Sequence, residues 1–187
     1  CGVTEMRECL RGIYSDVCAG PQGGPLMKRM AAKAVAFGEA RQPGFVDYCG
    51  QVVASASAMA DRLVARGIAL VSGGTDNHLM LLDLPRSDVP DSLTGKDAEA
   101  LLGQAGITVN KNTVPGEQRS PMVTSGVRIG TAAMTTRGMG AAESVRIADW
   151  IADLLTQPED EALRNSVRVE VRGMCLRFPI YPELGAA

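Results

Sequence analysis

Arg128 is the residue that first suggests chemistry, because it stands inside the apolar run Val-Arg-Ile-Gly at 127–130. That run is predicted to form a strand. A guanidinium in apolar surroundings needs an anion or several hydrogen-bond acceptors around it. A bound carboxylate would satisfy it. The alternative is a structural salt bridge with an Asp or Glu of the same chain, since buried arginines usually pair internally, and the sequence leaves both interpretations open.

A long polar segment, residues 110–125, lies between two predicted strands and ends just before Arg128. Polar loops of this length between strands usually carry function. We therefore expect the segment to supply donors and acceptors to a ligand near Arg128. The side chains that can do so are Asn110, Asn112, Thr113, Ser120, Thr124 and Ser125.

Gly23 and Gly24 precede Pro25 and a predicted helix at residues 26–40. Paired glycines let backbone N–H groups approach a ligand closely, and the N-terminus of a helix carries a partial positive charge. A phosphate group would bind well to such a segment. The plainer interpretation, a tight turn into the helix, is the more common one, so this signal is weak when taken alone.

The composition predicts a folded protein with a hydrophobic core. The 187 residues are 45% hydrophobic and 21% charged, which is typical of globular domains. A net charge of -2 supplies no basic field to attract nucleic acid or an anionic membrane. The longest apolar runs, such as residues 78–84, are far shorter than the roughly 20 residues of a membrane-spanning helix. We therefore expect no nucleic-acid partner and no membrane partner.

The cysteine and histidine content argues against a metal site and against disulfide bonds. The five cysteines are an odd number without a Cys-x-x-Cys pair, so neither a disulfide framework nor a structural zinc site is expected. The single histidine, His78, cannot form a histidine cluster, and at the start of an apolar strand it is more often structural than catalytic. Unpaired cysteines are typical of a reducing compartment, which predicts a cytoplasmic protein.

Helices and strands are predicted to alternate along the chain, while residues 1–20 hold no complete element. Apolar residues recurring every three or four positions predict helices at 44–66, 141–156 and 159–177. A content of Ala, Lys and Met after Pro25 predicts a helix at 26–40, and a capping box at Thr94 predicts one at 94–106. Short apolar runs predict strands at 68–72, at 78–84, around Thr108 and around Arg128. The first two strands are expected to form a hairpin. The expected fold is α+β, a short and mostly antiparallel sheet of about four strands with helices packed on one face.

Six blocks of the sequence resemble, in order and in spacing, the carboxy-terminal part of serine hydroxymethyltransferase. The resemblance extends from about Gln22 to the end of the chain, and the blocks together are far more specific than any one of them. They are Q-G-G-P-L-M at 22–27, A-K-A-V-A-F at 32–37, V-S-G-G-T-D-N-H-L at 71–79, L-T-G-K-D-A-E at 93–99, I-T-V-N-K-N-T-V-P at 107–115 and S-P-M-V-T-S-G-V-R-I-G-T at 120–131.

The resemblance implies an enzyme that uses pyridoxal 5'-phosphate to interconvert serine and glycine, with one-carbon transfer to or from tetrahydrofolate. On that basis Arg128 grips the carboxylate of the amino-acid substrate. Gly24, with Gly23 beside it, contacts the cofactor phosphate across a subunit interface. The residues implied to border the folate are Asn112, Ser120, Pro121 and Met122.

The resemblance also implies a division of the chain and an oligomer. Residues 1–42 would be a remnant of the large cofactor-binding domain with a linking helix. Residues 43–187 would be the carboxy-terminal small domain of a fold-type I transferase that depends on pyridoxal phosphate (PLP). The assembly would be a homodimer or a tetramer. The chain begins with Cys1 rather than with Met, which fits a truncated polypeptide.

The resemblance is incomplete at the catalytic lysine. Family members bind the cofactor as a Schiff base through a lysine in a Thr-Thr-His-Lys type segment, upstream of the Gln-Gly-Gly-Pro block, and this sequence contains no such segment. The groups that tune the cofactor ring in the large domain are missing too. No catalytic residue is therefore assigned, and the isolated chain is expected to be inactive. Its own lysines are Lys28, Lys33, Lys96 and Lys111.

A second hypothesis is a non-catalytic relative that acts as a binding or regulatory partner of an intact homologous subunit. Such a chain would complete a neighbour's phosphate site through Gly24 while lacking its own. A third hypothesis is that Arg128 and the glycines are only structural. In the first two cases the helices at 26–40 and 44–66 are expected to expose an apolar face.

Overall fold

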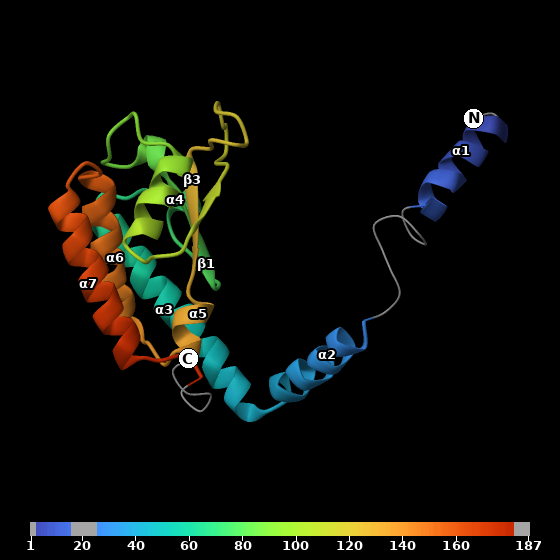
Figure 1. The fold of residues 1–187 in the computed structure, drawn as a ribbon, viewed down its shortest axis with the longest axis horizontal. Helices are drawn as coiled ribbons and strands as arrows, with labels where there is room; N and C mark the ends of the chain where they lie inside the picture. The colour runs from blue at the N-terminus through green and yellow to red at the C-terminus, as the bar shows by residue number, and fades with distance from the viewer. Residues whose placement is uncertain (1–2, 16–25, 182–187) are drawn as a thin grey trace. The chain divides into compact units, whose positions relative to one another are not determined.

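The computed structural model describes residues 3–15 and 26–181 (Figure 1). The chain divides into two units, Cys1–Phe45 and Val46–Ala187, and each is considered by itself. Within the described ranges, no helix combines the length and the apolar content that crossing a bilayer requires.

The first unit contributes the helices α1, Val3–Tyr14, and α2, Met27–Ala40. The prediction of α2 is confirmed to within one residue. The expectation that residues 1–20 hold no complete element is wrong, because α1 occupies most of them and carries the apolar side chains of Met6, Leu10 and Ile13 at helical spacing.

Helix α3, Pro43–Ala65, begins at the end of the first unit and continues into the second. Its predicted bounds are confirmed to within one residue. The apolar residues Val52, Ala56, Met59 and Leu63 recur at intervals of three or four and are all buried. The helix ends where Gly67 adopts a φ of 79°, a conformation that glycine accepts at no steric cost.

The sheet of the second unit has three antiparallel strands in the order β1-β3-β2. They are β1, Leu79–Asp83, β2, Asn110–Asn112, and β3, Gly126–Gly130. The α+β class and the antiparallel pairing are confirmed. The paired residues at the centre of β3 place Leu81, Arg128 and Asn110 in one row across the sheet.

The strand predicted at residues 68–72 does not form, so the described residues hold three strands rather than about four. Leu70 makes a single antiparallel bridge to Leu82, and the amide of Asp83 donates to the carbonyl of Ala69 at 2.9 Å. Pairing ends there because the next residues, Val71–Gly73, form a 3-10 turn. The turn therefore begins inside the predicted strand, at Val71, and not after its end.

Four further helices follow in the sequence. Helix α4, Gly95–Gln104, begins with the predicted capping box of Thr94, whose hydroxyl accepts from the amide of Asp97 at 3.1 Å. Helix α5 was not predicted, because five residues are too few to show a helical period. Helices α6 and α7 are confirmed within two residues. Their bounds are Ala132–Thr136 for α5, Ala141–Thr156 for α6 and Glu161–Arg177 for α7.

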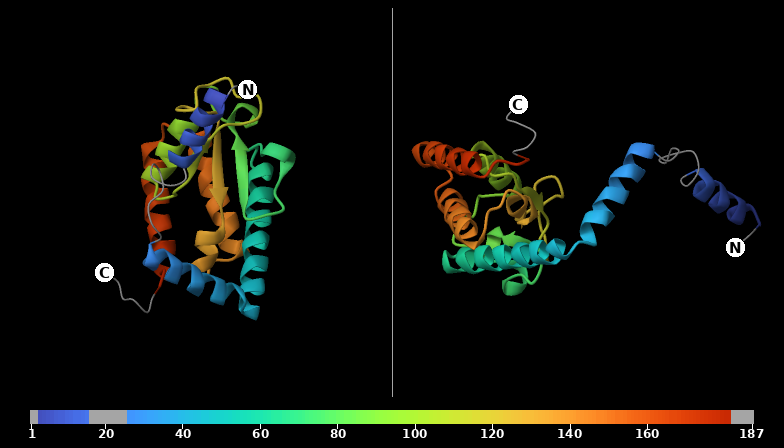
Figure 2. Two further views of the ribbon diagram at one scale, coloured as in Figure 1. Left: turned by 90° about the vertical axis from the view of Figure 1, so that its right-hand side faces the viewer. Right: turned by 90° about the horizontal axis from the view of Figure 1, so that it is seen from below.

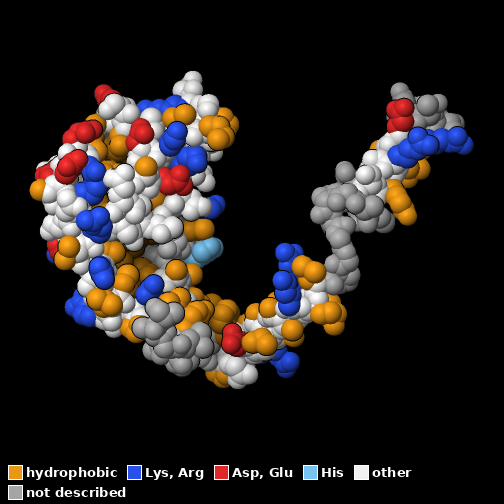
Figure 3. Space-filling model, viewed as in Figure 1, with side chains coloured by type: hydrophobic (Ala, Val, Ile, Leu, Met, Phe, Trp, Pro, Cys, Tyr) orange, Lys and Arg blue, Asp and Glu red, His pale blue; other side chains and the backbone are white. Residues whose placement is uncertain are grey.

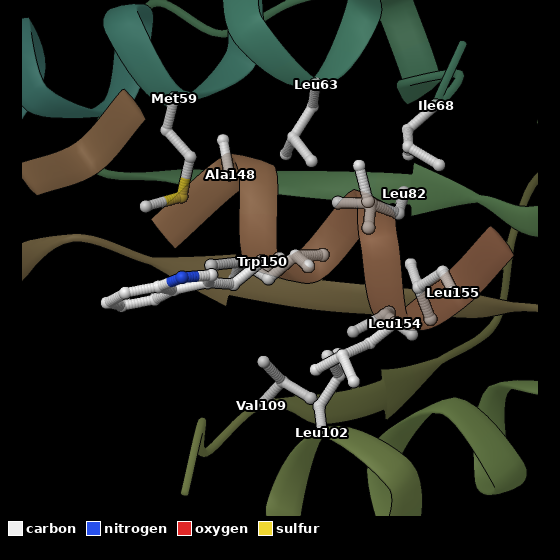
Figure 4. Packing of buried hydrophobic residues seen from close by; sticks show 14 of the residues in the cluster. Met59, Leu63, Ile68, Leu82, Leu102, Val109, Ala148, Trp150, Leu154 and Leu155 are labelled. Atoms are coloured by element: carbon white, nitrogen blue, oxygen red, sulfur yellow. The ribbon is translucent and has the colours of Figure 1, made fainter. Parts of the chain in front are cut away.

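The core lies between the sheet and the helices that accompany it. Helices α3 and α6 lie alongside the sheet, and α7 packs on α6 (Figure 2). Met59 and Leu63 point from α3 toward α6, where Ala148 and Trp150 meet them (Figure 4). Every apolar side chain removed from water here contributes on the order of 2 kcal/mol, so this cluster is the main source of the unit's stability.

Charged side chains join α3 to α6 at the edge of this core. Arg66 donates from Nη1 to Oδ1 of Asp149 and from Nη2 to Oδ1 of Asp153, each at 2.6 Å, and Nε of Arg62 donates to Asp149 at 2.8 Å. Burial alone would raise the pKa of Asp149, but the hydrogen bonds from the two guanidinium groups lower it below its ordinary value. Asp149 therefore stays ionised between two cations.

Candidate functional site

Arg128 lies on the face of β3 that points away from the core. Its neighbours Val127 and Ile129 are buried, whereas Arg128 itself is exposed, because successive side chains of a strand alternate between the two faces. The expectation that its guanidinium lies in apolar surroundings is therefore wrong. Within residues 3–15 and 26–181, it makes neither a hydrogen bond nor a salt bridge. The alternative interpretation, a structural salt bridge with an acid of the same chain, is therefore not seen there, and the guanidinium remains open to a ligand.

Asn112 and Arg128 share this face of the sheet. Asn112 is paired with Gly126, two residues before Arg128 in β3, so both side chains leave the sheet on the same side. The Asn112 side chain is half-buried and donates to the carbonyl of Thr113 at 2.8 Å, which leaves its side-chain oxygen as an acceptor. The sheet thus brings together two of the predicted site residues, the cationic Arg128 and Asn112, which can accept a hydrogen bond.

Glu117 organises the loop between β2 and β3. Its carboxylate accepts from the hydroxyl of Ser125 at 2.7 Å, from the amide of Ser125 at 2.8 Å, from the amide of Arg119 at 2.9 Å and from the amide of Val114 at 3.4 Å. Burial alone would raise the pKa of Glu117, but these hydrogen bonds outweigh it and lower the pKa. An ionised Glu117 thus ties both ends of the loop together.

Arg119 fixes the same loop to the segment before α4. It donates from Nη1 to the carbonyl of Leu93 at 3.0 Å and from Nη2 to the carbonyl of Asp91 at 3.2 Å. A guanidinium presents several donors in a fixed plane, so it can hold two carbonyls at once. Two side chains that follow the turn at Gly116, those of Glu117 and Arg119, therefore anchor the loop.

The end of the loop docks onto the first turn of α4. The amide of Gly95 donates to the carbonyl of Thr124, and the amide of Lys96 donates to the carbonyl of Val123, both at 3.0 Å. These contacts satisfy N–H groups that a helix leaves free at its start. Thr124 adopts a φ of 61°, which is uncommon for a residue with a β-branched side chain. The docking therefore holds the chain in a strained conformation four residues before Arg128.

Ser120, Pro121 and Met122 form the outer part of the loop, and all three are exposed. The hydroxyl of Ser120 accepts from the amide of Met122 at 3.2 Å, which makes a tight turn. Met122 leaves 74% of its surface in solvent. An apolar side chain so exposed, at the tip of an anchored loop, is suited to cover an apolar part of a ligand. Gly23 and Gly24 lie outside the described residues.

Comparison with known proteins decides the family. The family model described as "Serine hydroxymethyltransferase" matches residues 2–151. The chain belongs to this family. Its resemblance to serine hydroxymethyltransferase, inferred from the six blocks, is confirmed, and the match falls in the carboxy-terminal portion.

Individual relatives bear the same name. A serine hydroxymethyltransferase of Halorhodospira halophila is 58% identical over 169 residues, which is 90% of this chain and 40% of the relative. One from Xanthomonas euvesicatoria is 55% identical over 174 residues, which is 93% of this chain and 41% of the relative. The chain thus spans about two fifths of the length of the curated relatives that it matches.

The four lysines of the chain lie on helices and on strand β2. A Schiff-base lysine needs an enclosed, desolvated position. Lys28, Lys33 and Lys96 are exposed on helices, and Nζ of Lys111 lies 3.5 Å from Oε2 of Glu99. Among the described residues there is also no group of three or more His, Cys, Asp or Glu arranged to hold a metal ion.

Sequence reasoning missed Glu117 and Arg119, the residues that hold the loop. Their signal was an acidic and a basic residue immediately after the Pro-Gly turn at 115–116, within a segment otherwise rich in neutral polar residues. A carboxylate in that place can collect the free backbone N–H groups of the loop. The sequence shows that the segment is polar. It does not show that the charged residues of the segment form hydrogen bonds with the protein backbone rather than with a ligand.

Proposed function

We propose that this chain forms part of a PLP-dependent serine hydroxymethyltransferase, which interconverts serine and glycine with one-carbon transfer to tetrahydrofolate. The observation that carries the proposal is Arg128, an exposed guanidinium on an anchored strand that pairs with no acid in the described part of the chain. The family relationship supplies the reaction. The arginine supplies a means of holding the substrate.

In this proposal Arg128 binds the carboxylate of the amino acid. A guanidinium and a carboxylate match in planar geometry and form two parallel charge-assisted hydrogen bonds. The proposed folate contacts are Asn112, on the strand paired with β3, and Ser120, Pro121 and Met122, on the loop that leads into β3. Asn112 offers hydrogen bonds to the polar ring of the folate, and Met122 offers it an apolar cover.

Pyridoxal phosphate would supply the electron sink for the reaction when bound to the complete enzyme. In this proposal Gly23 and Gly24 contact its phosphate, whereas the described lysines fit no Schiff base. We infer that the isolated chain has no turnover of its own, since the covalent step needs a nucleophile from another segment. Residues 1–42 would then belong with the large domain, and residues 43–187 would form the small domain of a fold-type I transferase.

The proposed assembly is a homodimer or a tetramer, or a pairing with an intact homologous subunit, in the cytoplasm. A reducing compartment agrees with Cys9, Cys49 and Cys175, which are free thiols.

A chimera tests the proposal. The amino-terminal portion of the Halorhodospira halophila relative, up to the start of the matched region, is joined to this chain and assayed with serine, pyridoxal phosphate and tetrahydrofolate. We expect turnover in the chimera and none in the isolated chain. Arg128→Ala in the chimera should lower kcat/KM on the order of 100-fold, because two hydrogen bonds to a charged group are lost.

Arg172→Ala serves as the matched control, since Arg172 is exposed on α7 and belongs to no proposed site. It should leave kcat/KM unchanged. Equal loss in both variants, or full activity of Arg128→Ala, would exclude the proposed carboxylate contact. Clear turnover by the isolated chain would exclude the inference that its nucleophile comes from elsewhere.

A further inference from the structure

A cavity of about 300 Å³ lies inside the second unit, on the face of the sheet opposite Arg128. Ile129 of β3 contributes to its wall, and Ile129 and Arg128 point to opposite faces because they are neighbours in a strand. The other walls come from α3, α5, α6, α7 and the segment 106–108 between α4 and β2. A volume of this size is at the lower end of the range for small-molecule sites.

The deep part of the cavity is apolar and adaptable. Buried methionines reach it from three elements, Met59 of α3, Met134 of α5 and Met174 of α7, and Trp150 and Ile151 of α6 complete it. Met59 lies directly above the indole of Trp150 (Figure 4). Methionine side chains are flexible and polarizable, so they adjust to ligands of varied shape. Such a lining favours an apolar chain and excludes water.

Among the described residues that line the cavity, Arg137 alone is charged. It follows α5 and is half-buried, and its Nη1 donates to the carbonyl of Phe178 at 2.9 Å. In the described part of the chain, its remaining N–H groups have no acceptor and no carboxylate pairs with it. A half-buried guanidinium with free donors favours an anionic group beside it.

We propose that this cavity binds a small carboxylic acid with an unbranched apolar chain, such as a medium-chain fatty acid. The carboxylate pairs with Arg137 at the rim, and the chain lies between Met59, Trp150 and Ile129. The site is separate from the amino-acid site proposed at Arg128, and its ligand differs in needing no amino group. The charge of Arg137 sets the orientation of the ligand, and the apolar wall sets its affinity.

The single tryptophan of the chain provides the measurement, because Trp150 lines the cavity. The probes are butanoate, hexanoate and octanoate, titrated into the full chain while Trp150 fluorescence is followed. Each added methylene should lower Kd about fourfold, which corresponds to burial of one CH₂ group. Octanol, which has the chain without the charge, should bind at least tenfold more weakly than octanoate. Absence of a chain-length effect, or equal binding of octanol, would overturn the proposal.

Two variants separate the charge from the cavity. Arg137→Met should weaken octanoate binding at least tenfold, while Arg168→Met, a control at an exposed position of α7, should not. Ala133→Leu places a larger side chain at an exposed position on the rim and should block binding without loss of stability. Unchanged octanoate affinity in both Arg137→Met and Ala133→Leu would show that octanoate binds outside the cavity, and would overturn the proposal. The wild-type series decides the question even if a variant folds poorly.

Discussion

Glu117 and Arg128 illustrate two uses of a charged residue within a dozen positions. The carboxylate oxygens of Glu117 accept hydrogen bonds from within the loop, donated by Val114, Arg119 and Ser125. Arg128 makes no such contact within the described residues and stands exposed. A satisfied charge fixes a conformation, whereas an unsatisfied one attracts a ligand. Glu117 therefore fixes the conformation of the loop that leads to Arg128, and Arg128 is left to bind a ligand.

Replacement of Glu117 by Gln should make stability less dependent on pH. The pKa of Glu117 lies below its ordinary value of 4.5, so its contribution is fully present above that pH and is lost as the pH falls through the lower, folded pKa. At pH 7 we expect Glu117→Gln to cost about 1–3 kcal/mol of unfolding free energy. The difference from wild type should shrink below pH 4.5. Thermal unfolding at a series of pH values measures it.

Glu159→Gln is the matched control for this prediction, because Glu159 is exposed and accepts no hydrogen bond in the described structure. Its unfolding temperature should follow wild type at every pH. A constant gap between wild type and Glu117→Gln from pH 7 to pH 3 would contradict an ionised carboxylate as the organiser of the loop.

At the scale of single residues, the sequence predicted the protein family better than it predicted the surroundings of individual side chains. The motif around Arg128 led to the right family, but its flanking apolar residues suggested a buried guanidinium. The pleat of β3 places Val127 and Ile129 in the core and turns Arg128 outward, and that depends on which face of the strand is covered. Glu117 was missed because its partners are loop amides and the hydroxyl of Ser125, which no periodic pattern reveals.

The element that holds the site together is α4, whose first turn receives the end of the loop. Gly95 is buried there, and a side chain at this position would have no room. An added Cβ would lie 2.2 Å from Oγ1 of Thr124 and 2.6 Å from the carbonyl oxygen of Gly126. The second contact is with the backbone of β3, so rotation of a side chain cannot relieve it. The glycine permits helix and strand to approach each other closely.

Gly95→Ala should therefore destabilise the protein by about 1–3 kcal/mol, the usual cost of overfilling a packed region. Gly103→Ala, in the same helix, is the control, since its added Cβ would meet nothing within 4 Å. That substitution should stabilise by up to about 1 kcal/mol through helix propensity. Urea unfolding of both variants measures the difference. Similar effects at the two positions would mean that the close approach of α4 and β3 is unimportant.

Elements with a clear period were predictable from the sequence, and those set by long-range pairing were not. Helices α3, α6 and α7 follow from apolar residues at helical spacing, and α2 follows from its content of helix-forming residues. The segment 68–72 has strand-like composition, yet the Gly-Gly turn at 73–74 follows so closely that only Leu70 pairs. Helix α5 is too short to show a pattern. Register and strand number depend on contacts between distant segments.

At the scale of the whole molecule, the described residues of the first unit leave many apolar side chains exposed. No residue of α2 is buried, and its apolar side chains remain in solvent (Figure 3). Met27, Met30 and Phe37 fall on one side of the helix by its 3.6-residue period. Their exposed fractions are 74%, 53% and 67%. An apolar stripe of this kind usually marks a surface that another chain or segment covers.

The isolated chain is therefore expected to associate with itself through α2, and polar substitutions there should prevent it. Met30→Glu and Phe37→Glu together should lower the apparent mass in sedimentation velocity and reduce the binding of a hydrophobic dye, because the stripe loses its apolar character. Ala32→Glu adds a charge on the opposite side of α2 and should leave self-association intact. A protein that remains monomeric without any substitution would contradict the prediction. Loss of self-association in Ala32→Glu as well would assign the effect to net charge rather than to the stripe.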